Sequence, residues 1–193
     1  MTAERAGALL WGVFFVSWYA AVLWRAPARK HGSRSGAIRD VLFYAIGFFL
    51  LFTPQALGRT LWTSPAFVNG VLLALQLGFF AFAWWARIEL GRLWSGMITL
   101  REDHVVVRSG PYRLVRHPIY TGFIGGAWMF ALLTASPVSL LGAAFLTAQM
   151  AWKARREEQF LRAELGAEAY DSYARATPML VPFISFTRSR PAQ

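Results

Sequence analysis

Five long runs of apolar residues dominate this sequence and set the narrowest limit on its fold. A helix of about 20 apolar residues, rising about 1.5 Å per residue, is long enough to cross about 30 Å of hydrocarbon. The composition agrees, since 56% of the 193 residues are hydrophobic, against about 45–50% in ordinary soluble domains. The sequence therefore predicts an integral membrane protein. The runs cover residues 6–24, 41 to about 52–57, 66–86, 119–135 and 138–152.

The predicted fold class is all-α, with about five transmembrane helices in a single domain over residues 1–193. Ser136-Pro137 is typical of an N-cap followed by the first helical residue, so the last two spans should form a tight hairpin. Between the third and fourth spans, the β-prone runs 97–100 and 105–107 flank a polar turn. This pattern predicts a short β-hairpin-like loop.

The basic residues predict the orientation in the membrane, because arginine and lysine stay on the cytoplasmic side when they flank spans. Eighteen of the twenty fall after the first span, after the third span or in the tail, and only Arg5 and Arg59 fall on the other side. We therefore expect the N-terminus outside and the C-terminal helical tail in the cytoplasm. The net charge of +10 fits this topology and attraction to anionic membrane lipids. Its spread over three segments argues against a nucleic-acid partner.

Several classes of chemistry lack support in the sequence. The chain has no cysteine, so it offers no disulfide, thiol nucleophile or thiolate metal site. His31, His104 and His117 lie in separate segments without metal-ligand spacing, and we predict no metal site. No P-loop or dinucleotide-binding glycine motif is present.

The stretch Arg116-His117-Pro118-Ile119-Tyr120-Thr121-Gly122 marks the border between a basic loop and the fourth span. Pro118 is expected to be the first helical residue, which places His117 at or next to the N-cap. A helix start favours an anion, and an arginine suits the same group. The simpler interpretation is that Arg116 contacts lipid headgroups and Pro118 only starts the helix.

Two adjacent carboxylates, Glu157 and Glu158, follow the fifth span by about one turn. The helix should continue through them and end near Gly166, a plausible C′ glycine. At that distance they would lie just outside the hydrocarbon, near the start of the fourth span. They could accept hydrogen bonds from hydroxyl or ammonium groups, or they could simply form a solvated charged face.

Taken together, these motifs resemble the isoprenylcysteine carboxyl methyltransferase family and its relatives, the membrane phospholipid N-methyltransferases. The similarity covers the chain from Leu90 onward, so residues 1–89 contribute three spans and residues 90–193 the cofactor-binding half. The residues that carry it are Gly110, Pro111, Tyr112, Arg116, His117, Pro118, Tyr120, Gly122, Arg156, Glu157, Glu158, Leu161, Leu165, Gly166, Tyr170, Tyr173 and residues 178–184.

The resemblance implies S-adenosyl-L-methionine as the methyl donor and S-adenosyl-L-homocysteine as the product. It implies a cofactor pocket formed by Tyr112, Arg116, His117, Pro118, Tyr120, Gly122, Glu157 and Glu158. The family also uses an arginine before the final proline to hold a substrate carboxylate. Here Ala176 stands at one matching position and Arg175 beside it, so Arg175 is the predicted catalytic residue of this kind.

The resulting hypothesis is a membrane methyltransferase for a lipophilic acceptor, with the carboxylate of an isoprenylcysteine-like molecule favoured. Phospholipid amine methylation and a non-enzymatic lipid-binding scaffold are the alternatives. A carboxylate acceptor is already ionised, whereas an amine or thiol must lose a proton. The expected location is a prokaryotic inner membrane, with the site on the cytoplasmic side.

Overall fold

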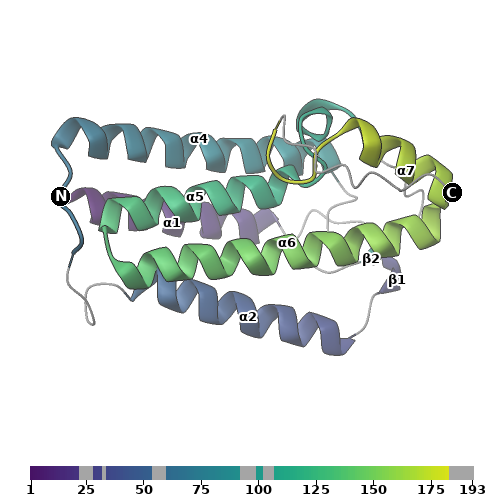
Figure 1. Ribbon diagram of the computed structural model, residues 1–193, viewed down its shortest axis with the longest axis horizontal. Coiled ribbons are helices and arrows are strands. Elements are labelled where there is room, and N and C mark those ends of the chain that lie inside the picture. The colour runs from purple at the N-terminus through teal and green to yellow at the C-terminus, as the bar shows by residue number, and fades with distance from the viewer. Residues whose placement is uncertain (22–27, 32–33, 54–59, 92–98, 102–106, 183–193) are drawn as a thin grey trace, which may run out of the picture.

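Five long helices form the body of the protein and run along its longest axis (Figure 1). The computed structural model describes residues 1–21, 28–31, 34–53, 60–91, 99–101 and 107–182. Helix α5 packs against α4, α6 and α1, and α2 packs mainly on the far side of α6. The five helices are α1 (Ala3–Ala20), α2 (Arg34–Phe52), α4 (Ala66–Leu90), α5 (Pro118–Thr134) and α6 (Pro137–Leu165).

Helices α5 and α6 form the predicted tight hairpin. Helix α5 ends at a residue in the left-handed conformation, Ala135, with a φ of 48°. Ser136 then takes the N-cap position of α6, and Pro137 is the first helical residue. Proline is suited to this position because its fixed φ is helical and its missing N–H would have no helical partner there.

Helix α6 continues through the paired carboxylates without a break, as the sequence predicts. It ends at Leu165, because Gly166 adopts a φ of 93° that turns the chain. The predicted helical tail follows as α7 (Ala167–Ala176), which packs back against α6. The last two helices therefore bring the tail to one end of the bundle (Figure 1).

Aromatic side chains fill the centre of the bundle. Trp11 of α1 is 1% exposed. Its ring centroid lies 4.7 Å from that of Phe80 on α4 and 5.4 Å from that of Phe48 on α2, both with edge-on geometry. Aromatic pairs prefer such geometry and bury large apolar areas. Three helices are thus held around one indole.

The predicted β-hairpin is wrong as a local structure. Strand β2 (Thr99–Arg101) pairs antiparallel with β1 (Ala28–His31), which follows the first helix. The register joins Lys30 to Leu100, with an irregularity between Ala28 and Lys30. Most of the expected second strand, at residues 105 and 106, lies outside the described residues. A strand can satisfy its backbone groups with any neighbouring strand, so local alternation did not identify the partner.

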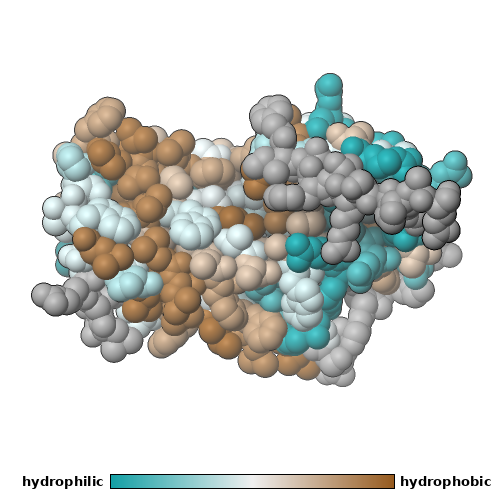
Figure 2. Space-filling view, viewed as in Figure 1, coloured by the Kyte–Doolittle hydropathy of each residue, from teal (hydrophilic) through white to brown (hydrophobic). Residues whose placement is uncertain are grey.

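The five predicted spans coincide with the five long helices, but they differ in apolar character. Among the described residues, only α4 is both long and apolar enough to cross a membrane by length and composition, and α5 is apolar but shorter. Exposed apolar side chains nevertheless cover the sides of the bundle, whereas hydrophilic residues gather at the α7 end (Figure 2). Five membrane crossings therefore stay a prediction.

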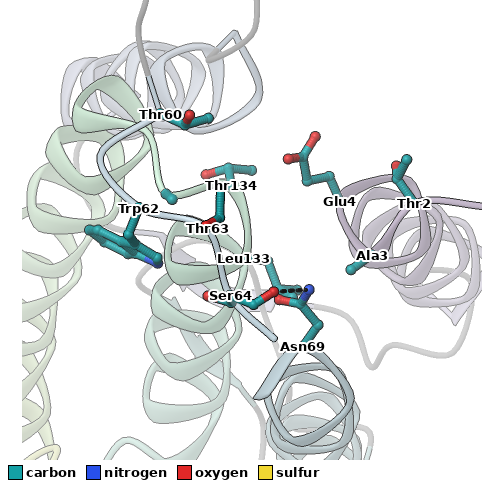
Figure 3. A pocket seen from close by; sticks show the side chains of 11 residues that line it. Thr2, Ala3, Glu4, Thr60, Trp62, Thr63, Ser64, Asn69, Leu133 and Thr134 are labelled. Atoms are coloured by element: carbon teal, nitrogen blue, oxygen red, sulfur yellow. Dashed lines mark hydrogen bonds between the residues drawn. The ribbon is translucent and has the colours of Figure 1, made fainter. Parts of the chain in front are cut away.

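A polar pocket of about 230 Å³ lies at the opposite end of the bundle from α7 (Figure 3). Hydroxyl side chains line much of it, among them Thr63, Ser64 and Thr134. Glu4, in the first turn of α1, is the only charged side chain among its described lining residues. Asn69 Nδ2 donates to the Ser64 carbonyl at 3.3 Å. This end of the molecule is polar but carries little charge.

Candidate active site

The start of helix α5 is positioned by a turn and a short 3-10 helix. Gly110 has a φ of 53°, and a Cβ there would lie 2.9 Å from the Glu89 carboxylate, so only glycine fits this turn. The 3-10 helix η3 (Gly110–Arg113) follows and buries Tyr112. His117 is the N-cap of α5 and Pro118 its first residue, as the sequence predicts. The chain thus delivers Arg116 and His117 to the end of the bundle that holds α7.

Arg116 and Glu158 form a two-pronged ion pair between the start of α5 and the charged part of α6. Arg116 Nε donates to Glu158 Oε1 at 2.7 Å, and Nη2 donates to Oε2 at 3.2 Å. The two side chains are 12% and 18% exposed. Fork-to-fork pairing of this kind combines charge with geometric specificity. It fixes both carboxylate oxygens of Glu158.

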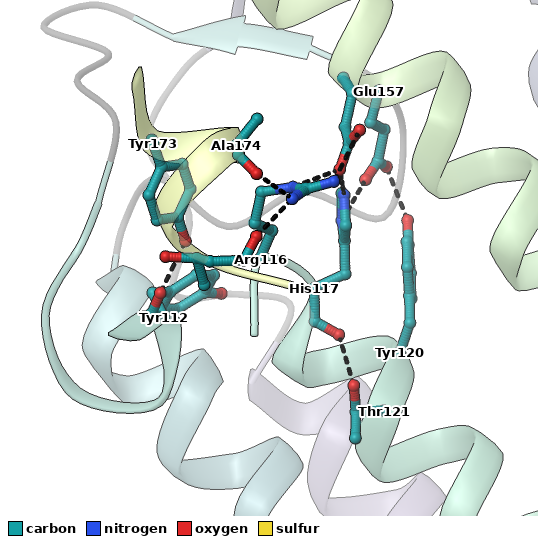
Figure 4. A network of polar contacts seen from close by, with 10 residues as sticks. Tyr112, Arg116, His117, Tyr120, Thr121, Glu157, Tyr173 and Ala174 are labelled. Atoms are coloured by element: carbon teal, nitrogen blue, oxygen red, sulfur yellow. Dashed lines mark hydrogen bonds and ion pairs between the residues drawn. The ribbon is translucent and has the colours of Figure 1, made fainter. Parts of the chain in front are cut away.

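His117 lies between the two carboxylates (Figure 4). Its Nε2 is 3.0 Å from Glu158 Oε1, and its Nδ1 is 3.7 Å from Glu157 Oε2. Because an ionised carboxylate only accepts hydrogen bonds, Nε2 carries the proton in the first contact. The His117 side chain therefore does not cap α5. It orients Glu158 instead.

Tyr120 supports the second carboxylate. It stands one turn into α5, stacks against the His117 ring with centroids 5.6 Å apart, and donates its hydroxyl to Glu157 Oε1 at 2.6 Å. The residue spacing of the motif explains this arrangement, because positions three apart on a helix share one face. His117 thus orients Glu158, and Tyr120 orients Glu157.

The charged form of Glu158 is stabilised in this setting. Burial on its own would raise the pKa of the carboxyl group, but the hydrogen bonds from His117 and Arg116 outweigh burial and hold the pKa below its ordinary value of 4.5. Glu158 is therefore an anion at neutral pH. The Arg116–Glu158 contact is therefore an ion pair.

The segment after α7 crosses the start of α5 and accepts hydrogen bonds from the two residues that precede its first helical residue. We call residues 178–180 the strap. The backbone N–H groups of Arg116 and His117 donate to the carbonyls of Pro178 at 2.9 Å and Met179 at 3.1 Å, and Thr121 Oγ1 donates to the Leu180 carbonyl at 2.6 Å. The strap carbonyls therefore accept from the N-cap residue of α5 and from the residue before it, which ties the tail to the start of this helix.

Further bonds tie α7 to the same place. Arg116 Nη1 donates to the carbonyl of Ala174 at 2.8 Å and to that of Thr177. These are carbonyls at the C-terminal end of α7, where a cation is favourable. The buried hydroxyl of Tyr173 donates to the Tyr112 carbonyl at 2.7 Å. Burial raises the pKa of Tyr173 to about 12, against the lowering effect of Arg116 and Arg108, so this hydroxyl remains a donor at neutral pH.

Comparison with known proteins agrees with this geometry. Residues 68–163, from α4 to nearly the end of α6, match the model of the isoprenylcysteine carboxyl methyltransferase (ICMT) family. This region contains both halves of the Arg116–Glu158 pair. The chain belongs to the ICMT family. The matched region ends before α7 and the strap.

Three relatives illustrate the range of the ICMT family and its neighbours. The cobalt-zinc-cadmium resistance protein CzcN of Cupriavidus metallidurans is 30% identical over 160 residues, covering 80% of this chain and 66% of that protein. Protein-S-isoprenylcysteine O-methyltransferase B of Arabidopsis thaliana is 32% identical over 105 residues, covering 52% of each chain. Methanethiol S-methyltransferase 2 of Bradyrhizobium diazoefficiens is 42% identical over 79 residues, covering 41% of this chain and 29% of that protein.

The chain spans about half to two thirds of the length of the first relatives that it matches. The part matched by the family model, residues 68–163, carries the charged cluster. The ICMT-family motif and the observed contacts point to the same five side chains. They are Arg116, His117, Tyr120, Glu157 and Glu158.

Four other residues of the predicted site lie outside these side-chain contacts. The first, Tyr112, is buried, and its carbonyl accepts from Tyr173. Gly122 is packed against α4, where a Cβ would come within 2.6 Å of the Phe79 carbonyl oxygen, so close helix packing accounts for this glycine. Pro118 is buried and serves as the first residue of α5. Arg175 is exposed on the last turn of α7, and no hydrogen bond or ion pair joins it to the described part of the cluster. Its role with a substrate stays a prediction.

The structure adds residues that the ICMT motif does not include. Asp40 of α2 is buried and accepts from Arg156 Nη1 at 2.8 Å and from Gln149 Nε2 at 3.4 Å. Lys153 of α6 is buried beside the tyrosine that supports Glu157. The spacing of Lys153, four residues before Glu157, could have indicated a shared helix face. Nothing in the local sequence indicated Asp40, because its partners depend on how α2 packs on α6.

Proposed function

We propose that this protein is an S-adenosylmethionine-dependent methyltransferase that acts at a membrane on a lipophilic acceptor. An isoprenylcysteine-like carboxylate is the favoured acceptor. The proposal is supported by membership of the ICMT family and by relatives named as O- and S-methyltransferases. The observation that carries it is the cluster of two partly buried carboxylates held by Arg116, His117 and Tyr120.

The chemistry of this cluster fits the methyl donor. S-Adenosylmethionine carries an ammonium group and ribose hydroxyls, which are hydrogen-bond donors that carboxylates accept. Both oxygens of Glu158 are engaged by Arg116 and His117, whereas Glu157 Oε2 has only the longer contact to His117. We therefore assign Glu157 as the main acceptor for the donor molecule. Glu158 then acts chiefly through His117, by fixing the imidazole.

The donor, when bound, supplies an electrophilic methyl group on a sulfonium. Transfer to an acceptor is an in-line displacement that depends on alignment and on exclusion of water. In this chain Tyr120 and His117 would orient the pocket, and the strap and α7 would exclude water from it. A carboxylate acceptor needs no base. A thiol would have to lose its proton, and His117 is the nearest group suited to that task.

The membrane setting is part of the proposal. The apolar helix α4 and the exposed apolar sides of the bundle support insertion (Figure 2). The hydrophilic α7 end would then face the cytoplasm, with the N-terminus outside, in a prokaryotic inner membrane. A lipophilic acceptor could enter from the bilayer. We keep five crossings as the working topology, and a reporter fused after Gln193 that is active only in the periplasm would contradict it.

A small-thiol S-methyltransferase is the second candidate. It is favoured by the methanethiol S-methyltransferases of Bradyrhizobium diazoefficiens and of a Pseudomonas strain, which are 42% and 40% identical over 79 residues. Phospholipid amine methylation and a non-enzymatic scaffold remain as alternatives. Acceptor assays separate the enzymes from one another. Donor binding separates all of them from the scaffold.

Calorimetric titration of the purified protein with S-adenosylhomocysteine tests the proposed function. We expect binding by the unaltered protein and a loss of roughly 1–3 kcal/mol in Glu157→Ala and His117→Ala, because each removes a partner from a buried polar group. Gln159→Ala, an exposed change on the same helix, is the control and should bind normally. Absence of heat with the unaltered protein would reject a methyltransferase and favour the scaffold.

A further inference from the structure

Two arginines from different helices stack on one tryptophan at the edge of the apolar part of the bundle. Trp152 lies on α6 and is 36% exposed. The guanidinium carbon of Arg39 on α2 lies 4.3 Å from the centroid of its ring, and that of Arg156 on α6 lies 4.9 Å from it. Stacking on an aromatic ring holds a guanidinium group in place and leaves its N–H donors available at the edge. One indole therefore positions two sets of donors.

The two guanidinium groups come together beside Gly36 of α2. If this residue carried a Cβ, the atom would lie 2.8 Å from Arg156 Nη2 and 3.8 Å from Arg39 Nη2. Both Nη2 atoms thus lie close to one point. Hydrogen bonds from a guanidinium group to a phosphate are about 2.7–2.9 Å long. The oxygens of a single phosphate can therefore accept from both arginines.

The two arginines share one carboxylate. Asp40 is the only carboxylate within ion-pair distance of either guanidinium group among the residues that the structure describes. Its Oδ1 accepts from Arg156 Nη1 at 2.8 Å but lies 4.0 Å from Arg39 Nε, which is too long for a hydrogen bond. The Arg39 side chain is 42% exposed. Each guanidinium group has five N–H donors, so donors remain here for a second anion.

The surface beside this pair is apolar, which indicates the source of the anion. Ile38 and Val41, near Arg39 on α2, are 57% and 65% exposed. Trp152 is the last residue of the fifth apolar run, and Arg39 comes two residues before the second run begins. Tryptophan is enriched at membrane interfaces, and arginine side chains there extend toward the headgroups. The pair therefore lies where the phosphate of a phospholipid would meet its acyl chains.

We propose that Arg39, Arg156 and Trp152 form a binding site for the phosphate group of an anionic phospholipid. The acyl chains would cover the exposed apolar side chains of α2. A headgroup with an ammonium group of its own fits less well, because like charges would then lie side by side. A bound lipid would also link α2 to α6 one residue before Glu157. This inference goes beyond methyl transfer and depends only on the membrane setting.

The test measures lipid binding to the full-length protein in detergent by native mass spectrometry, together with thermal unfolding. The probes are phosphatidylglycerol as the anionic lipid, phosphatidylcholine as the zwitterionic lipid and inorganic phosphate as the soluble anion. Arg39→Gln is the test variant, because it leaves the Arg156–Asp40 pair in place. Arg155→Gln is the matched control, since it removes an exposed arginine next to Arg156.

We expect the unaltered protein to bind one phosphatidylglycerol at least about tenfold more tightly than phosphatidylcholine, and to unfold at a higher temperature with it. Arg39→Gln should weaken this binding by about tenfold, the size of one charge-assisted hydrogen bond. Arg155→Gln should stay within about twofold of the unaltered protein. Arg39→Lys keeps the charge but loses the planar fork, so it should still weaken binding by about threefold.

Four results would overturn the inference. Unchanged phosphatidylglycerol binding by Arg39→Gln would contradict the site, and an equal loss in Arg155→Gln would mean attraction to the net charge of +10 alone. Equal binding of phosphatidylcholine would contradict selection of an anionic headgroup. Displacement of the lipid by an equal concentration of inorganic phosphate would assign the pair to a soluble anion. If Arg39→Gln fails to fold, Arg39→Lys takes its place, and unchanged binding by that variant would contradict the site.

Discussion

The two ends of the helix bundle are both polar, but one carries ion pairs and the other carries mostly hydroxyl groups. At the α7 end, carboxylates and cations from α2, α5 and α6 are paired; Asp40 is buried, and Arg116, Arg156 and Glu158 are partly buried. At the opposite end, the pocket of about 230 Å³ is lined largely by hydroxyl groups, and Glu4 is its one charged side chain among the described residues. Thr134 there donates to a carbonyl of its own helix, Ala131, at 3.0 Å.

The proposed site lies at the charged end, beside α7. Buried ion pairs are often no more stabilising than apolar residues of the same size, because removing charges from water is costly. Removing a hydroxyl group from water costs less free energy when it donates to a nearby backbone carbonyl. The concentration of partly buried ion pairs at one end is therefore consistent with the proposed site there. The predictions below test that contrast, from the largest expected effect to the smallest.

Breaking the Arg116–Glu158 pair should have the largest effect. Arg116→Ala leaves Glu158 without its main cation and releases two carbonyls of the tail. Removing one member of a fully buried pair typically costs about 3–5 kcal/mol, and we expect a smaller loss for this partly buried pair. Thermal unfolding and S-adenosylhomocysteine titration should both show a clear loss. The exposed pair of Arg162 and Asp171, which has similar geometry, is the control, and Arg162→Ala should cause no measurable change.

Lowering the pH should weaken the Arg116–Glu158 pair, and only in a narrow pH range. The pKa of Glu158 is held below 4.5, so its contribution to stability is fully present above that ordinary value and is lost as pH falls through the lower folded value. The difference in unfolding free energy between the unaltered protein and Glu158→Gln should therefore be constant from pH 7 to 5. It should shrink only below pH 4.5. A difference that already shrinks between pH 7 and 6 would contradict an ionised, depressed carboxyl.

Loosening the tail should have a moderate effect. Tyr173→Phe removes the hydroxyl that donates to the Tyr112 carbonyl in a buried setting. The expected cost is about 1 kcal/mol. Hydrogen exchange at the amides of Arg116 and His117 should accelerate, because their acceptors belong to the strap. Unchanged exchange at both amides would mean that α7 and the strap are held independently.

Arg175→Leu sharpens the contrast between an exposed and a partly buried cation. Because Arg175 is exposed and Arg116 is only 12% exposed, we expect Arg175→Leu to lose less acceptor turnover than Arg116→Ala. Affinity for S-adenosylhomocysteine should not change. A larger loss in Arg175→Leu, measured as kcat/KM with N-acetyl-S-farnesylcysteine, would restore the arginine to the role that the family resemblance implies.

A change at the opposite end should have the smallest effect. Glu4→Gln removes the charge from the hydroxyl-lined pocket but touches no residue of the cluster. S-Adenosylhomocysteine affinity and acceptor turnover should both match those of the unaltered protein. A clear loss of either would show that the two ends are coupled through the bundle.

Local signals in the sequence predicted much of the fold. Pro118, Ser136-Pro137 and Gly166 mark helix ends that the structure confirms. The reason is physical: a proline or a positive-φ glycine restricts the backbone wherever the rest of the chain lies. The pairing of the Arg116-His117 motif with Glu157-Glu158 was also expected, because one hairpin returns the chain to the same end.

Features that depend on distant packing were not predicted. The partner of strand β2 comes from the segment after α1, and Asp40 meets Arg156 only because α2 packs on α6. Likewise, no local pattern showed that Pro178 and Met179 would take the N–H groups at the start of α5. Each of these contacts joins segments whose relative positions no short stretch of sequence determines.

The strap also has a consequence for biosynthesis. Its carbonyls meet the start of α5 only after the whole α5–α6 hairpin and α7 have been made. During translation, Arg116 and His117 therefore leave the ribosome long before the groups that will cover them. A growing chain would carry the paired carboxylates while the pocket is still open to water. The proposed site is therefore complete only once the tail has folded back.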